Sequence, residues 1–178
     1  MEKKNLWNEA AKYGAILALV SIAFTVAQMY LQNGVLSFTS LLVYVLLLYY
    51  FTKRRVQLYG AGDNGYSYGQ CLKFIFCMVL FAGILNGAYQ IVASNWLFTE
   101  KYDEMLSMSI ASMETIGIYN KAQLDLMTSM GQTLYHSPIY LMFAGVLGSV
   151  IKGVFFGLFV AAFTSRNPNI FNSNNNPE

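Results

Sequence analysis

Residues 139–163 read "IYLMFAGVLGSVIKGVFFGLFVAAF", and Lys152 is the only charged residue in this otherwise apolar run. A helix needs about 20 residues to cross the hydrocarbon core of a bilayer. Strands buried in soluble proteins are far shorter than this run, typically about 4 to 8 residues. The stretch therefore predicts a transmembrane helix.

Three further apolar segments, residues 13–31, 36–52 and 74–97, are long enough or nearly long enough to do the same. Across its 178 residues the chain is 56% hydrophobic and only 11% charged, and its mean hydropathy is +0.42. An ordinary soluble domain is about 25% charged. We expect an all-α integral membrane protein with four transmembrane helices.

The remaining segments complete this organisation. Residues 99–138 predict an extracytoplasmic amphipathic helical segment between the third and fourth spans. Residues 1–166 are expected to form a single domain. Residues 167–178 are rich in asparagine and contain two prolines, which is typical of a disordered tail.

The basic residues predict the orientation of the chain. Eight of the eleven precede the first span, lie between the second and third spans, or follow the fourth: Lys3, Lys4, Lys12, Lys53, Arg54, Arg55, Lys73 and Arg166. Lysine and arginine near span ends are retained on the cytoplasmic side, so we expect both termini in the cytoplasm and localisation in the inner membrane. A reporter fused near Lys121 should read as external, and a cytoplasmic reading there would invert the topology.

Residues 60–65, "GAGDNG", match the dinucleotide-binding pattern G-x-G-x-x-G. In that fold the pattern follows a buried strand and is followed about 20 residues later by an acidic residue. Here it follows a predicted membrane span, and the next acidic residue after Asp63 is Glu100. We interpret it as a glycine-rich turn and expect no nucleotide cofactor. Ser67 and Gln70 have the spacing of a capping box, which predicts that the third helix begins there.

The stretch "GYSYGQCLKFIFCMVLFAGILNGAYQIVASNWLFTEKYDEM", residues 65–105, and its four-span frame resemble the bacterial membrane proteins catalogued as domain of unknown function 4199, known mostly from Bacteroidetes. In that family a Gly-x-Ser-Tyr/Phe-x-x-Ala-x-Lys pattern recurs at the entry to the third helix. Gly65, Ser67, Tyr68 and Lys73 match it, and Cys71 replaces the common alanine. The resemblance implies no established activity, cofactor or catalytic residue. Members are often encoded beside family-2 glycosyltransferases, which suggests a glycosyltransferase-type partner and a role in envelope glycan or lipid-linked sugar assembly.

We identify no catalytic, cofactor-binding or metal-binding residues. His136 is the only histidine, and no acidic residue near it in sequence completes a triad. Cys71 and Cys77 are six residues apart on one helix, on different faces, which argues against a disulfide and a zinc site.

Methionines recur three apart in the outer segment, as in Met105 with Met108 and Met127 with Met130. Thioether sulfur can bind Cu(I), and positions three apart share a helix face. We favour a structural role, because the same residues fit two amphipathic faces. The first face comprises Tyr102, Met105, Leu106, Ile110 and Met113; the second comprises Leu124, Met127, Met130 and Leu134. Two short helices, broken near Gly117, would pack on each other or lie on the membrane.

Small residues recur every fourth position along the fourth span, at Gly145, Ser149, Gly153 and Gly157. Gly83 and Gly87 make a second G-x-x-x-G pattern in the third span. Small residues allow close approach of helix backbones in lipid. We favour packing of the two spans within one chain, and a homodimer is the alternative.

Lys152 is the one ionisable residue near the centre of a predicted span. A lysine at that depth costs about 2.5 to 3.5 kcal/mol on insertion scales, so it should face protein or trapped water. Asn86 and Gln90 lie four apart in the third span and offer carbonyl oxygens as acceptors. We predict a candidate intramembrane polar site formed by Lys152, Asn86 and Gln90.

Two functions remain open. A non-enzymatic accessory or scaffold subunit for a membrane-associated partner is favoured by the tight-packing stripes and by the lack of a recognisable catalytic set. A small transporter or permeation subunit is the alternative, and it would use Lys152. An intramembrane enzyme ranks third, because the predicted spans contain no acidic residue. Membrane lipid, and either a membrane protein or a second copy of the chain, are the expected partners; nucleic acid is not.

Overall fold

The computed structural model describes residues 5–31, 34–60 and 65–166, and these residues are helical almost throughout. The helices are α1 (Leu6–Leu31), α2 (Gly34–Tyr59), α3 (Tyr68–Val92), the π-helical turn η1 (Ala93–Leu97), α4 (Thr99–Ile116), α5 (Lys121–His136) and α6 (Pro138–Thr164). Over the described ranges the only strand-like pairing is one isolated bridge, between Tyr66 and Arg166. The predicted all-helical fold is confirmed.

Four of these segments, α1, α2, α3 with η1, and α6, are long and apolar enough to cross a membrane. Each contains one of the predicted spans, which supports a multi-pass membrane protein. The helices are longer than the apolar segments: α1 begins at Leu6, and α2 continues through Lys53, Arg54 and Arg55 to Tyr59. Charged residues that the sequence places outside the spans are therefore part of the same rigid helices.

The capping box before α3 is confirmed. The Ser67 backbone N–H donates to Gln70 Oε1 at 2.9 Å, and the Gln70 backbone N–H donates to Ser67 Oγ at 3.4 Å. Of the glycine-rich turn before it, residues 61–64 lie outside the described residues, as do the predicted reversal at residues 32–33 and the tail 167–178.

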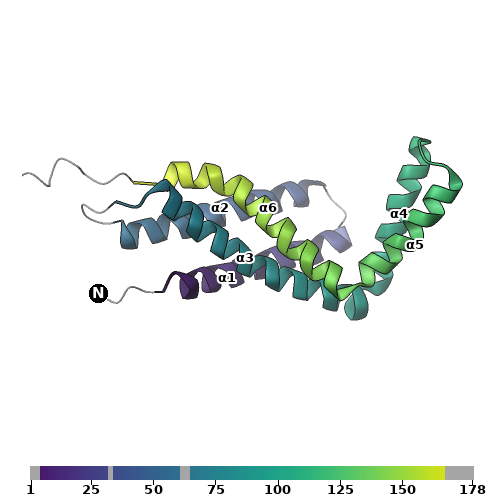
Figure 1. Ribbon diagram of the computed structural model, residues 1–178, viewed down its shortest axis with the longest axis horizontal. Helices are drawn as coiled ribbons and strands as arrows, with labels where there is room; N and C mark the ends of the chain where they lie inside the picture. The colour runs from purple at the N-terminus through teal and green to yellow at the C-terminus, as the bar shows by residue number, and fades with distance from the viewer. Residues whose placement is uncertain (1–4, 32–33, 61–64, 167–178) are drawn as a thin grey trace, which may run out of the picture. The chain divides into compact units, whose positions relative to one another are not determined.

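The chain divides into two compact units, residues 1–83 with 148–178, and residues 84–147. In the first unit, α1 and α2 run alongside the first part of α3 and the last part of α6 (Figure 1). Its core contains fully buried side chains from α1, α2 and α3: Leu17, Leu48, Phe74, Ile75, Met78 and Val79. Gly14 brings α1 onto α3, because a Cβ atom there would lie 2.5 Å from the Met78 carbonyl oxygen.

Two glycines of α6 lie directly against α3 in this unit. A Cβ atom on Gly153 would lie 2.3 Å from Val79 Cγ1, and one on Gly157 would lie 2.8 Å from Ile75 Cγ2. Real side chains do not approach that closely, so any larger residue would force the helices apart. The first unit therefore contains the kind of close helix contact that the G-x-x-x-G pattern indicates.

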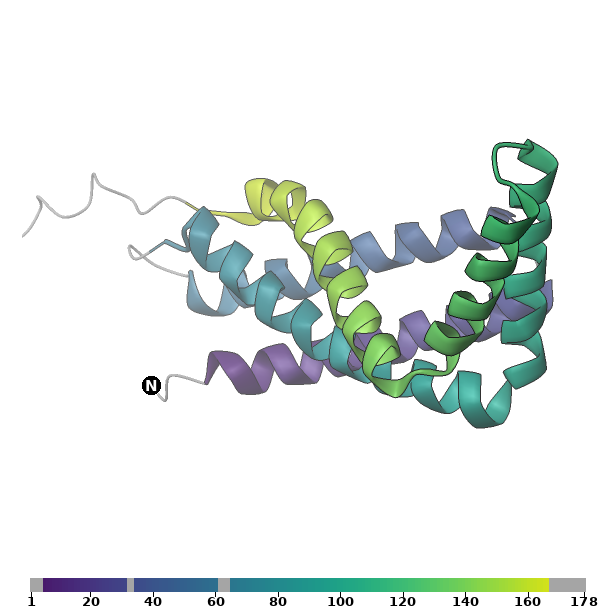
Figure 2. The ribbon, with the colours of Figure 1, turned by 45° about the vertical axis from the view of Figure 1, so that its right-hand side comes forward.

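The second unit contains a hairpin of α4 and α5, which lie side by side in both ribbon views (Figures 1 and 2). α4 ends at Ile116 and is capped by Gly117, whose φ of 72° lies in the left-handed region that favours glycine. Asn120 then caps α5: its Oδ1 accepts from the Gln123 backbone N–H at 2.9 Å, and Gln123 Oε1 accepts from the Asn120 N–H at 3.0 Å. The predicted helix break near Gly117 is confirmed.

The two helices of the hairpin pack on each other through small and aromatic residues. A Cβ atom on Gly131 of α5 would lie 2.6 Å from Leu106 Cδ1 of α4. The rings of Tyr102 and Tyr135 meet edge to face, with their centroids 6.2 Å apart. Met105 and Met130, which the sequence assigns to the apolar faces, are about half exposed at 50% and 54%, so the buried faces are narrower than predicted.

Candidate functional site

Lys152 projects from α6 toward α2 in the first unit. Its ammonium nitrogen lies 4.1 Å from the centroid of the Tyr44 ring, which is the geometry of a cation–π interaction. Lys152 forms no ion pair with any carboxylate of the described residues. An aromatic ring, and not an acid, therefore faces this charge.

Lys152 and Tyr44 line a cavity of about 140 Å³, which we call the membrane pocket. Its walls come from α1, α2 and α6, and its lining is Leu17, Val20, Ser21, Phe24, Thr25, Gln28, Ser40, Tyr44, Leu47 and Lys152. Six of these ten residues are polar, although all of them lie in helices suited to crossing a membrane. Polar side chains in such helices are costly to bury in lipid and commonly mark functional sites.

The pocket extends along the helices from the end at which α1 stops and α2 starts. Gln28 is three residues from the end of α1, and Ser21 is ten residues from it, which corresponds to roughly 5 and 15 Å at the helical rise. Tyr44 is ten residues into α2, again roughly 15 Å. The polar lining thus continues from near the helix ends to about the middle of the spans.

Some of the polar groups that line the pocket form hydrogen bonds with other described residues, and some do not. The Gln28 amide donates to Ser40 Oγ at 3.2 Å, and the Ser40 hydroxyl donates to the Ser37 carbonyl oxygen at 2.8 Å. Thr25 donates to the Ser21 carbonyl oxygen at 2.9 Å. The buried Tyr44 hydroxyl has no hydrogen-bond partner among the described residues.

The other members of the predicted polar site, Asn86 and Gln90, are half-buried residues of α3 in the second unit. Lys152 belongs to the first unit, so its pairing with them stays a prediction. Among the predicted packing residues of the second unit, Gly87 lies against α6: a Cβ atom there would lie 3.0 Å from Met142 Cα. Gly145, also in the second unit, is buried; in the first unit Gly83 is buried and Ser149 is half-buried.

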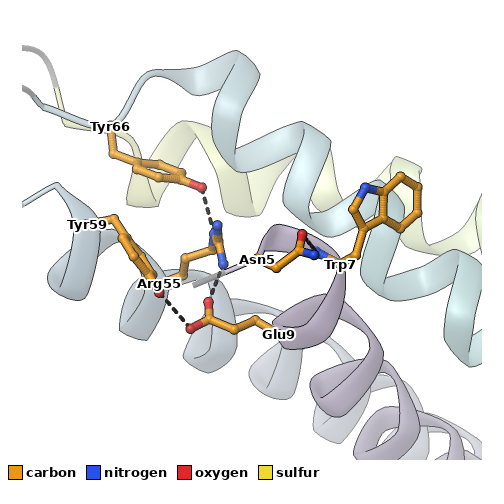
Figure 3. Close-up of polar contacts among 6 residues, drawn as sticks. All are labelled: Asn5, Trp7, Glu9, Arg55, Tyr59 and Tyr66. Atoms are coloured by element: carbon orange, nitrogen blue, oxygen red, sulfur yellow. Dashed lines mark hydrogen bonds and ion pairs between the residues drawn. The ribbon is translucent and has the colours of Figure 1, made fainter. Parts of the chain in front are cut away.

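A charged network at the opposite end of α1 and α2 was missed by the sequence analysis (Figure 3). Arg55 of α2 is 6% exposed, and its Nη1 forms an ion pair with Glu9 Oε2 of α1. The Arg55 Nε donates to the Tyr66 hydroxyl at 2.8 Å, and the Tyr59 hydroxyl donates to Glu9 Oε1 at 2.8 Å. Sequence reasoning started the first span at Tyr13 and so left Glu9 outside it.

The network also connects to α3 and α6. The guanidinium carbon of Arg55 lies 4.7 Å from the centroid of the Phe74 ring in α3. The backbone of Tyr66 exchanges two hydrogen bonds with that of Arg166, just after α6, at 2.8 and 2.9 Å. Burial raises the pKa of the Tyr66 hydroxyl, and the hydrogen bond from Arg55 acts in the opposite direction. This network ties together all four long helices at one end of the first unit.

His136 has an acidic neighbour that its sequence position did not reveal. Its Nε2 lies 3.2 Å from Asp103 Oδ1, across the α4–α5 hairpin. The pair is solvent-exposed, so it contributes about 0.2 to 1 kcal/mol when the histidine is protonated. Burial in the same hairpin raises the pKa of Tyr102 to about 12. The pair supports hairpin packing, because each helix supplies one partner.

Both cysteines are buried in α3. Cys71 Sγ accepts a long hydrogen bond from the Thr164 hydroxyl of α6 at 3.8 Å. Thr164 also donates to the Val160 carbonyl oxygen at 2.7 Å. Cys71 therefore has a packing role at the contact of α3 with α6.

Comparison with known proteins identifies one family. A sequence model described as "Protein of unknown function (DUF4199)" matches residues 12–166, from the first turns of α1 to just beyond α6. No curated protein and no solved structure matches this chain.

Proposed function

Because the chain belongs to the DUF4199 family of proteins of unknown function, we propose its role from its geometry: a non-enzymatic accessory subunit that binds a partner protein at a membrane. A glycosyltransferase-type protein of envelope glycan or lipid-linked sugar assembly is the partner that the family resemblance suggests. The role needs a surface outside the spans on which such a partner can dock.

The proposed setting is a bacterial inner membrane with both termini in the cytoplasm. The distribution of lysine and arginine supports this orientation, since eight of the eleven lie at the same predicted side. The α4–α5 hairpin then lies on the extracytoplasmic side. It belongs to neither of the flanking spans, and its second helix, α5, begins with a capping box at Asn120.

Exposed apolar side chains at the turn of this hairpin carry the proposal. Ile116, Ile118 and Tyr119 are 62%, 75% and 37% exposed, and we call them the hairpin tip. Exposed apolar residues in the long helices are explained by lipid, but this explanation does not extend to the hairpin. Apolar groups clustered outside the spans mark a protein-binding or membrane-binding surface.

The second candidate, a small transporter or permeation subunit, is supported by the membrane pocket. A polar cavity with a charge inside a span is a common feature of transport pathways. However, Leu17 both lines the pocket and belongs to the fully buried core with Leu48 and Met78. A pocket that ends on packed side chains favours holding a ligand over conducting it.

Photocrosslinking tests the accessory role. A photocrosslinking amino acid in place of Ile118 is expected to capture one membrane protein in intact cells, because the hairpin tip would lie in the interface. The same amino acid in place of Met130, which is also exposed and apolar but lies along α5, serves as the control. Crosslinks to lipid alone, or equal protein capture at both positions, would contradict a partner-binding tip.

A further inference from the structure

We propose that the membrane pocket is a binding site for a phosphate group, supplied either by a lipid headgroup or by a free phosphate. The pocket holds the Lys152 ammonium among hydroxyl and amide groups, and none of the acidic residues in the described ranges lines it. This inference does not rest on the accessory role, because the pocket and the hairpin tip belong to different units.

The first argument is charge. An ammonium in a membrane span is costly unless a compensating group is present. Lys152 forms no salt bridge with a carboxylate in the described part of the chain. The described residues therefore supply no negative charge to the ammonium. The Tyr44 ring lies 4.1 Å away and offsets only part of the cost. An anion in the pocket would complete the neutralisation.

The second argument is hydrogen bonding. The Tyr44 residue is only 5% exposed, and its hydroxyl has no partner in the described ranges. The Gln28 amide uses one of its two N–H groups on Ser40, which leaves the other N–H available. The Tyr44 hydroxyl is shielded from solvent and lies against Gly153, so the Gln28 amide is the donor that accompanies the cation.

The donor chemistry favours phosphate over carboxylate. A carboxylate is planar and is matched best by the two-pronged fork of arginine. Lysine is a compact point charge that commonly binds phosphate. Here the Gln28 amide comes from α1 and the Lys152 ammonium from α6, so the donors are separate groups and not one planar fork.

Size and access are consistent with a phosphate group. The pocket measures about 140 Å³, and a cavity of roughly 150 Å³ holds a molecule the size of benzene. It therefore admits a phosphate group but not a whole lipid. Thr25 and Lys152 are exposed at the surface of the first unit, so the rest of a larger molecule can remain outside the pocket.

Native mass spectrometry of the full chain in a phosphate-free maltoside detergent tests this proposal with two probes, phosphatidylglycerol and inorganic phosphate. We expect one probe to bind with one-to-one stoichiometry. Lys152→Met should weaken its binding by about 10- to 150-fold, the equivalent of a hydrogen bond to a charged group. Gln28→Leu removes the amide donor of the pocket, so it should weaken binding by about two- to tenfold.

Lys53→Met is the matched control, because the Lys53 ammonium also lies over a tyrosine ring, 5.3 Å from the centroid of Tyr49, but outside the pocket. Its binding should equal that of the unmodified protein. Loss of phosphatidylglycerol binding only in the pocket variants would identify a lipid source, and the same loss for inorganic phosphate would identify a free one. Binding of neither probe, or equal binding by Lys152→Met and the unmodified protein, would overturn the proposal.

Discussion

Arg55→Met is expected to lower the free energy of unfolding by about 3 to 5 kcal/mol, the usual effect of removing one partner from a buried ion pair. The Glu9 carboxylate would keep its hydrogen bond from Tyr59 but lose its counter-charge in a site that is largely shielded from solvent. The Tyr66 hydroxyl would lose its donor as well. SDS titration of the purified protein in detergent, followed by circular dichroism, measures this change.

Two controls identify the cause. In the double variant Glu9→Met with Arg55→Met, no unpaired charge remains, so most of the lost stability should return. Glu104→Gln removes the carboxylate of an exposed ion pair in which Lys101 Nζ lies 2.7 Å from Glu104 Oε2. It should lower the free energy of unfolding by at most about 1 kcal/mol. If Arg55→Met were as mild as Glu104→Gln, the buried network would not stabilise the first unit.

Gly153→Leu is expected to destabilise the protein by about 1 to 3 kcal/mol or more, as overpacking of a dense core does. Even its Cβ atom would lie 2.3 Å from Val79 Cγ1 and 2.9 Å from the Tyr44 hydroxyl oxygen. The substitution therefore separates α6 from α3 and also distorts the membrane pocket. The same SDS titration measures the loss of stability, and the phosphate-binding assay measures the damage to the pocket.

Gly148→Leu is the matched control on the same helix, because no neighbouring atom of the described residues lies within 4 Å of a Cβ atom at that position. It should leave stability nearly unchanged, or raise it slightly through the better helix propensity of leucine. Equal effects at the two glycines would mean that α6 does not pack on α3 through Gly153.

Features that depend on neighbouring residues could be predicted from the sequence. A long apolar run specifies a spanning helix, because the bilayer leaves few alternatives for the backbone. Ser67 with Gln70, and the helix break at Gly117, were identified because caps and left-handed glycines act within a few residues. The predicted helix ends were less accurate, because the first turns of α1 and the last turns of α2 are polar and so lie outside the apolar runs that mark the spans.

Features that depend on distant residues could not be predicted. Glu9 and Arg55 are 46 residues apart, and Arg55 carries the same sequence signal as its exposed neighbour Arg54. Asp103 and His136 meet only because the hairpin folds back on itself. The membrane pocket likewise consists of ordinary serine, threonine and glutamine residues, which become a site only where α1, α2 and α6 converge on Lys152.

Purification of the full chain in mild detergent, with mass spectrometry of the associated proteins, tests the proposed accessory role most directly. We expect one membrane protein to accompany the chain in stoichiometric amount, and Ile116→Ser with Ile118→Ser at the hairpin tip to abolish this association while Met130→Ser preserves it. A clean homo-oligomer that carries solute across liposome membranes, with no associated protein, would contradict the account.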